Sequence, residues 1–328
     1  MRHTKAPVAG AILAVFLSFA IPTSAQAKSA LAELRVEGPM VTLDPGAWYV
    51  TRPEEVRKSR PADDCERTGG EIAIEGPTPL SLVASGEAFN RDLSQVRVRR
   101  DEAGLFICEI GSFLGRGFTD PAGFAGWTYY EDFVFGSSAA DQFELETNDR
   151  IMWVFSDFGE TTQANSGDVL EMRGVPPRSR GTFTLRVVGH RFDGSVNPAT
   201  GVTIEGAESV SDLGDGRYEV SVPHGMTTLR AVRGVDVPSN QLETCTRADL
   251  SDCPRAHGRT IVGSARGDEL PGTRGFDDIS GRGGDDTIDI RNGGRDRVNC
   301  GGGDDEVLAD RGDSDDAVAP SCEKVKRT

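Results

Sequence analysis

Histidine is scarce in this sequence, with 4 among 328 residues. Those beyond the N-terminal segment are His190, His224 and His257, and none stands at zinc-ligand spacing to a pair of cysteines. The sequence also lacks the G-x-S-x-G, H-E-x-x-H and P-loop motifs of hydrolases, metalloproteases and nucleotide-binding proteins. We therefore expect a protein that is not an enzyme. A secreted hydrolase that uses two carboxylates far apart in the sequence stays an alternative.

Long apolar runs are equally scarce. The run at 8–21 is shorter than the ~20 residues that cross a membrane as a helix. Arg2 and Lys5 precede it, and the small-residue sequence AQA (25–27) follows it. This order predicts a signal peptide at 1–27 and a secreted, extracellular protein without a membrane span after cleavage. An uncleaved anchor is the alternative.

Positive charge is in short supply, since 36 Lys and Arg stand against 52 Asp and Glu, a net charge of −16. Such a chain does not neutralise phosphates, which argues against a nucleic-acid partner. Half of the excess lies at 258–323, with 16 acidic residues and 8 arginines. A segment with this charge repels itself unless cations bind to it.

Glycine and aspartate, by contrast, are abundant in the same segment. Two nonapeptides, GTRGFDDIS (272–280) and GRGGDDTID (281–289), fit the pattern G-G-x-G-x-D-x-U-x without a gap, where U is a large aliphatic residue. This pattern is typical of calcium-binding parallel β-helices. Imperfect copies surround them, at 263–271 and around Asp296 and Asp305.

Each nonapeptide predicts half a coil, a turn followed by a short strand. The aliphatic residues would point inward and stack, namely Leu270, Ile279, Ile288, Val298 and Val307. Because two nonapeptides complete one coil, aspartates in repeats n and n+2 should face each other and offer oxygens to calcium. The predicted pairs are Asp268 with Asp286, Asp277 with Asp296, and Asp286 with Asp305. Asp286 would thus be shared by two pairs.

These repeats resemble the hemolysin-type, or repeat-in-toxin (RTX), calcium-binding family over about 260–318. The resemblance implies a parallel β-roll that binds Ca²⁺ through Asp268, Gly275, Asp277, Gly284, Asp286, Gly294, Asp296, Gly303 and Asp305. Arg266, the inserted Ile290 and the decay of the pattern from Ala309 to Val318 favour few ions. Two alternatives are a disordered acidic tail rich in glycine and a folded tail that has lost its ions.

Six cysteines in an exported chain predict three disulfides. Neighbourhood in the sequence favours Cys65–Cys108, Cys245–Cys253 and Cys300–Cys322, while other pairings stay open. The last pair would close a loop over the end of the repeats.

The part at 28–162 is predicted to be a β-rich domain with one helix at 79–89. Its segments PLSLVASGEAF, LFICEIGSF, GWTYYEDFVFGS and NDRIMWVF resemble the transcobalamin-like domain, a small α+β or β domain at the C-terminus of transcobalamin and intrinsic factor. In transcobalamin this domain contacts cobalamin, so the resemblance implies a corrinoid-like ligand that stacks on Trp127 and Tyr129. Where the family has Asn-Gly, this chain has Glu-Asp (131–132), a departure that puts the family's usual tight hairpin turn in doubt.

Short alternating strands at 163–241 predict a second domain, an immunoglobulin-like β-sandwich. We expect a linker with a small disulfide loop at 242–262 and the calcium-binding β-roll at 263–328. The fold class is thus mainly β. Together these features predict a secreted calcium-binding protein whose β domains bind a cell surface or another extracellular ligand. The alternatives are a corrinoid-like ligand-binding protein and a secreted hydrolase.

Overall fold

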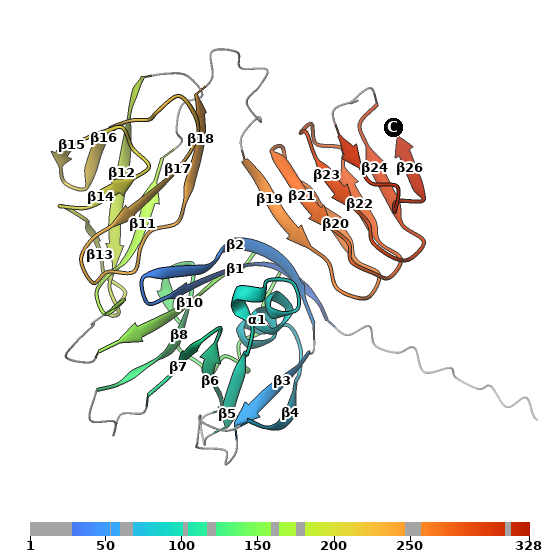
Figure 1. Cartoon of the computed structure of the whole chain (residues 1–328), viewed down its shortest axis with the longest axis horizontal. Coiled ribbons are helices and arrows are strands. Elements are labelled where there is room, and N and C mark those ends of the chain that lie inside the picture. The colour runs from blue at the N-terminus through green and yellow to red at the C-terminus, as the bar shows by residue number, and fades with distance from the viewer. Residues whose placement is uncertain are drawn as a thin grey trace, which may run out of the picture.

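The structure, a computed structural model, describes residues 28–52, 54–59, 68–100, 104–116, 123–158, 164–174, 181–246, 257–311 and 316–328. Strands dominate these residues, which confirms the mainly β fold class (Figure 1). No helix among them is long and apolar enough to cross a membrane. The predicted signal peptide, 1–27, lies outside the described residues.

In the first part of the chain, two sheets and one α-helix share a core. The elements in order are β1 (Ala30–Gly38), β2 (Val41–Thr51), β3 (Glu54–Ser59), β4 (Thr68–Ile74), α1 (Pro79–Glu87), η1 (Arg91–Leu93), β5 (Arg97–Arg100), β6 (Leu105–Ile110), β7 (Phe113–Leu114), β8 (Ala125–Glu131), β9 (Val134–Phe135) and β10 (Arg150–Asp157). One sheet runs β2-β1-β10-β8-β9, and the other runs β4-β3-β5-β6-β7.

Helix α1 begins where the sequence predicts, because Thr78 caps it and Pro79 occupies its first turn. Thr78 Oγ1 accepts a hydrogen bond from Ser81 N at 3.1 Å, and Ser81 Oγ accepts one from Thr78 N at 2.7 Å. This reciprocal pair is a capping box. The helix ends at Glu87, two residues before the predicted end at 89.

The hairpin between β8 and β9 has a tight turn although it lacks Asn-Gly. Glu131 pairs with Val134, so Asp132 and Phe133 are the two turn residues, with φ of 44° and 69°. Left-handed backbone at both positions is the conformation of a type I′ turn. Phe133 stacks on His190 at 4.9 Å between ring centroids, which holds this less favourable conformation in place. The tight turn therefore forms despite the departure from Asn-Gly.

The second part of the chain consists of two small sheets that enclose a core of their own. Its strands are β11 (Val169–Arg173), β12 (Thr182–His190), β13 (Val196–Pro198), β14 (Thr203–Glu205), β15 (Ser209–Gly214), β16 (Arg217–Ser221), β17 (Gly225–Val232) and β18 (Leu242–Thr246). One sheet runs β11-β12-β16-β15, with β13 on β12, and the other runs β14-β17-β18. Strand β18 thus lies within the segment predicted as a linker.

A buried ionic network joins the first and second parts. Arg35 and Glu37 on β1 form an ion pair at 2.7 Å, and Arg230 on β17 reaches Glu37 at the same distance. Arg35 also donates hydrogen bonds to the carbonyl oxygens of Pro238 (2.6 Å) and Ser239 (2.7 Å). Because buried charges are costly unless they are paired, this network fixes the second part against β1.

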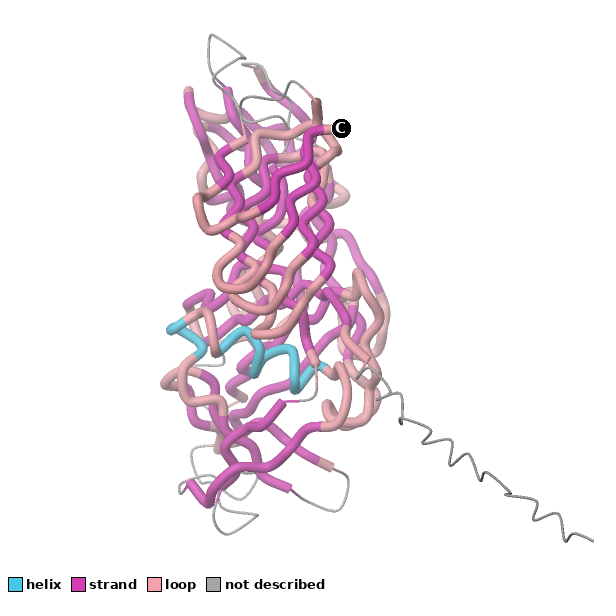
Figure 2. The backbone as a smooth tube through the Cα atoms, turned by 90° about the vertical axis from the view of Figure 1, so that its right-hand side faces the viewer, coloured by secondary structure: helices cyan, strands magenta, loops and turns pink. Residues whose placement is uncertain are grey.

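The third part is a β-solenoid of about three turns (Figure 2). Its strands are β19 (His257–Val262), β20 (Glu269–Pro271), β21 (Phe276–Ser280), β22 (Thr287–Ile290), β23 (Arg297–Asn299), β24 (Glu306–Ala309), β25 (Ala317–Val318) and β26 (Lys324–Arg327). They form two parallel ladders, β19-β21-β23-β25 and β20-β22-β24-β26. The five aliphatic residues predicted to point inward are each at most 1% exposed, which confirms the stacking.

The solenoid continues a sheet of the first part, as Figure 1 shows. Strand β19 pairs in parallel with β2, with Ile261 opposite Trp48. Trp48 and Val50 on β2, and Leu31 on β1, belong to the apolar interior of the solenoid. The first part therefore covers the N-terminal end of the coils, where an unpaired strand edge would otherwise be exposed.

One predicted disulfide, Cys300–Cys322, is confirmed and links the last coils. Cys108 and Cys245 are also disulfide-bonded. Their predicted partners, Cys65 and Cys253, lie outside the described residues.

Candidate metal centre

Acidic residues form two columns along the solenoid, one at the start of each ladder's strands. Column A consists of Asp268, Asp286, Asp305 and Glu323, which immediately precede β20, β22, β24 and β26. Column B consists of Asp277, Asp296 and Asp316, at the start of β21, β23 and β25. Each column repeats once per coil, so its carboxylates are brought close by the parallel register of the ladders.

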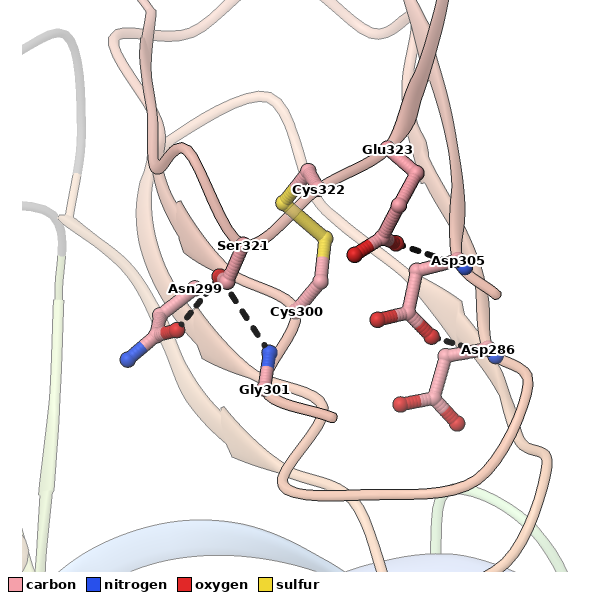
Figure 3. Close-up of a disulfide and its surroundings, with 8 residues drawn as sticks. All are labelled: Asp286, Asn299, Cys300, Gly301, Asp305, Ser321, Cys322 and Glu323. Atoms are coloured by element: carbon pink, nitrogen blue, oxygen red, sulfur yellow. Dashed lines mark hydrogen bonds between the residues drawn. A yellow bond between two sulfur atoms is a disulfide. The ribbon is translucent and has the colours of Figure 1, made fainter. Parts of the chain in front are cut away.

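Within column A, each carboxylate after Asp268 accepts a hydrogen bond from the backbone of the coil before it, as Figure 3 shows for Asp305 and Glu323. Asp268 N donates to Asp286 Oδ1 at 2.9 Å, and Asp286 N donates to Asp305 Oδ1 at 2.8 Å. Asp305 N donates to Glu323 Oε2 at 3.0 Å. The two aspartate pairs predicted for this column are therefore neighbours in space.

Column B follows the same rule. Asp277 N donates to Asp296 Oδ1 at 2.9 Å, and Asp296 N donates to Asp316 Oδ1 at 3.1 Å. The third predicted pair, Asp277 with Asp296, is thus also brought together.

Two carboxylate oxygens in column A lack hydrogen-bond donors. Asp286 Oδ2 and Asp305 Oδ2 are buried and accept no hydrogen bond. The two residues are 1% and 0% exposed. A buried charged oxygen without a partner is costly, and a cation is the partner that removes this cost most effectively.

Backbone carbonyls face the same space as these carboxylates. A β-carbon added at Gly281 would overlap both Asp286 Oδ2 and the carbonyl oxygen of Cys300. One coil earlier, a β-carbon at Gly263 would lie 3.1 Å from Asp268 Oδ2 and 2.5 Å from the carbonyl oxygen of Gly281. Glycine therefore leaves room for a cradle in which carboxylate and carbonyl oxygens converge. Hard cations such as calcium take both kinds of oxygen as ligands.

The predicted glycines serve the stacking of the turns. Gly284 and Gly303 have φ of 95° and 147°, which few other residues adopt, and a β-carbon on either would collide with the backbone of the preceding coil. Gly294 lies against the carbonyl oxygen of Gly275 in the same way. The four predicted glycines, Gly275, Gly284, Gly294 and Gly303, allow the turns to stack closely and contribute no side-chain ligand.

Asp277 and Asp268, the first members of the two columns, are satisfied by donors of the protein itself. Asp277 accepts hydrogen bonds from Arg259 N (2.5 Å), Thr273 Oγ1 (2.9 Å) and Thr273 N. Asp268 accepts one from Ser264 N (2.6 Å) and forms an ion pair with a side chain of the first part. The candidate site therefore centres on Asp286 and Asp305 rather than on Asp268 or Asp277.

The side chains alone do not make a complete metal site. Across the described parts of the chain, no three His, Cys, Asp or Glu side chains form a group that could hold a metal ion. An ion in column A would therefore take most of its oxygens from the backbone of the turns.

Sequence reasoning missed Asp316 and Glu323, the last members of the two columns. The signal was present, because Asp316-Ala317-Val318 and Glu323-Lys324-Val325 keep an acidic residue two positions before an aliphatic one. The missing glycines and the irregular spacing concealed it. The pattern that decays after Ala309 in the sequence continues as strands β25 and β26 in the structure.

Burial within the solenoid raises the pKa of Asp286 to about 7. The hydrogen bond from the backbone of Asp268 acts in the opposite direction, while the charges of Asp268 and Asp305 raise the pKa further. A carboxyl group in this state is poorly stabilised as an anion, and a bound divalent cation would stabilise the ionised form.

In the presence of chelator, the solenoid should lose stability as the pH rises from about 4 to about 7. The pKa of Asp286 is about 7 in the folded state and near its ordinary 3.8 in the unfolded state, so the folded state binds more protons over this interval. The destabilisation is absent below the unfolded-state pKa of 3.8 and complete above the folded-state pKa of about 7. Urea midpoints at about pH 5 and pH 8 measure the difference, which Asp286→Asn should reduce. A higher midpoint at pH 8 would contradict the sign.

The function has to be inferred from this geometry. No protein-family model, curated protein or solved structure matches the chain. The resemblances of the C-terminal repeats to the hemolysin-type family, and of the first part to the transcobalamin-like domain, therefore stay predictions, as does the immunoglobulin-like topology of the second part.

Proposed function

We propose that this chain is a calcium-binding protein without enzymatic activity, in which Ca²⁺ stabilises the C-terminal solenoid. The observation that carries the proposal is the pair of buried oxygens, Asp286 Oδ2 and Asp305 Oδ2, that accept no hydrogen bond. They repeat at the same position of successive coils, and Asp286 Oδ2 lies beside the carbonyl oxygen of Cys300 at Gly281. The acidic excess of the segment supports a cation as the missing partner.

Calcium fits this arrangement better than other common divalent cations. It accepts six to eight oxygens in flexible geometry, as stacked turns rich in carbonyls provide. Magnesium requires a tight octahedron and usually keeps several waters, and zinc prefers nitrogen and sulfur ligands. Extracellular calcium modules bind in the range of about 10⁻⁴ to 10⁻³ M, which suits a secreted protein.

The first two parts of the chain are proposed to bind a cell surface or another extracellular ligand, with the solenoid anchored on the first part. The corrinoid-like alternative receives no support from the rings predicted to stack on the ligand. Trp127 and Tyr129 are buried in the core of the first part, where Trp127 Nε1 donates to the carbonyl oxygen of Phe113 at 3.0 Å. Their faces contact other core side chains, as in the pairs Trp127–Phe155 and Tyr129–Trp153.

Millimolar calcium should raise the thermal unfolding midpoint of the solenoid in the full chain, and magnesium at the same concentration should do far less. A ligand at 100 times its dissociation constant stabilises the folded state by about 2.7 kcal/mol. Circular dichroism melts in calcium, magnesium and chelator measure the shift, and equilibrium dialysis counts the bound ions. Identical melts in calcium and chelator would refute the proposal.

A further inference from the structure

An arginine of the first part reaches into the first turn of column A. Arg52 follows directly after β2, and its guanidinium is buried. Nη2 forms an ion pair with Asp268 Oδ1 and donates a hydrogen bond to the carbonyl oxygen of Gly267 at 3.1 Å. The guanidinium thus contacts one carboxylate and one turn carbonyl, which are the two kinds of oxygen that a calcium ion takes.

The position of Arg52 follows from the continuous sheet. Strand β2 lies beside β19 as an additional coil would, and its C-terminal end brings Arg52 to the turn that holds Asp268. Among the described residues, column A has no earlier aspartate to share an ion with Asp268, because β20 is the first strand of this ladder. The end of the column would therefore hold an unpaired buried carboxylate without Arg52.

Asp268 and Asp286 differ in whether the protein supplies donors to both of their carboxylate oxygens. Both lie at the same position of the repeat and both are buried. Both oxygens of Asp268 have donors, one from Arg52 and one from Ser264 N, whereas Asp286 Oδ2 has none. The positive charge is thus supplied by the protein at the first position and is missing at the following one.

We propose that the guanidinium of Arg52 replaces a calcium ion at the first position of column A, so that the first part caps the solenoid and calcium binding begins at Asp286. The proposal rests on the proposed calcium function. It implies that the carboxylate of Asp268 is neutralised without calcium, so that the first coil forms a folded template on which the later coils bind ions. It also implies that the full chain binds fewer ions than its repeats would allow.

The test uses the full chain with Arg52→Gln, which removes the charge and keeps a side chain of similar length. In chelator, the solenoid of this variant should melt roughly 5 °C lower than that of the unmodified chain, because Asp268 becomes a buried charge without a partner. In calcium, equilibrium dialysis should find one more bound ion per chain, since Asp268 is free to share one.

Two further variants separate a specific role of Arg52 from a general loss of charge or packing. The double variant Arg52→Gln/Asp268→Asn leaves no unpaired charge and should regain most of the lost melting temperature in chelator. Arg266→Gln removes an exposed arginine of the same turn and should change neither the melting temperature nor the number of ions.

The proposal is overturned if Arg52→Gln melts like the unmodified chain in chelator, if the double variant is no more stable than Arg52→Gln, or if the number of bound ions stays the same. If neither the unmodified chain nor any of the three variants binds calcium, the proposed calcium function is refuted instead. The melting temperatures in chelator would then still decide whether Arg52 neutralises Asp268.

Discussion

Asp286→Asn and Asp305→Asn should each weaken calcium binding by at least about 100-fold, whereas Asp268→Asn should weaken it far less. Substitutions of residues that only support a metal ligand already cost about 10–100-fold, so the loss of a ligand charge should cost no less. The carboxylates of Asp286 and Asp305 each keep one oxygen without a donor, while that of Asp268 is saturated by the protein. Asparagine keeps the shape and the hydrogen bond from the preceding coil.

Calorimetric titration of the full-length variants at one pH measures these affinities. Asp278→Asn is the matched control, because Asp278 is an exposed aspartate in the same solenoid and its ion pair with Arg297 spans 3.8 Å. Its affinity should equal that of the unmodified chain. Equal affinities for all four variants would place the ions outside column A.

The coiled part of the fold could be predicted from the sequence because its determinants are local and periodic. An aliphatic residue such as Ile279 or Ile288 recurs at a fixed position after each turn, and the coil length then dictates which residues stack. The same arithmetic predicts that Asp286 and Asp305 are neighbours in successive coils. It also made Asp286 the most important aspartate, because only it had predicted partners on both sides.

The structure changes this ranking through contacts that the period does not encode. Glu323 extends column A beyond Asp305, so Asp305 also has neighbours on both sides. Arg52 meets Asp268 across 216 residues of chain, and the pairing of β2 with β19 that brings them together spans a similar distance. Neither residue type nor spacing in one sequence reveals such a contact, since it depends on how separately folded units dock.

The hairpin between β8 and β9 is a smaller example of a structure that depends on a distant contact and cannot be predicted from the local sequence. Turn statistics allow left-handed backbone at Asp132 but argue against it at Phe133. The ring of Phe133 stacks on His190, which belongs to a strand of the second part. A local penalty is thus offset by a distant contact that the local sequence does not contain.

Gly281→Ala should abolish the calcium-dependent rise in melting temperature of the full chain. A methyl group at this position would overlap Asp286 Oδ2 and the carbonyl oxygen of Cys300, the two oxygens that converge on the cradle. The carbonyl belongs to the backbone of the next coil and moves little, so the carboxylate has to turn away from the ion. Overpacking of this kind should also cost about 1–3 kcal/mol of stability in chelator.

Gly302→Ala is the control that makes this test decisive. Gly302 lies in the turn of the following coil, pairs with Gly283, and a β-carbon there would have no atom within 4 Å. The added methyl group therefore enters open space, and the calcium response of this variant should match that of the unmodified chain. Melts of both variants in calcium and in chelator give the comparison. A preserved calcium response in Gly281→Ala would mean that the ion is not held between Asp286 and Cys300, and an equal loss in both variants would mean that any added methyl group disturbs the coils.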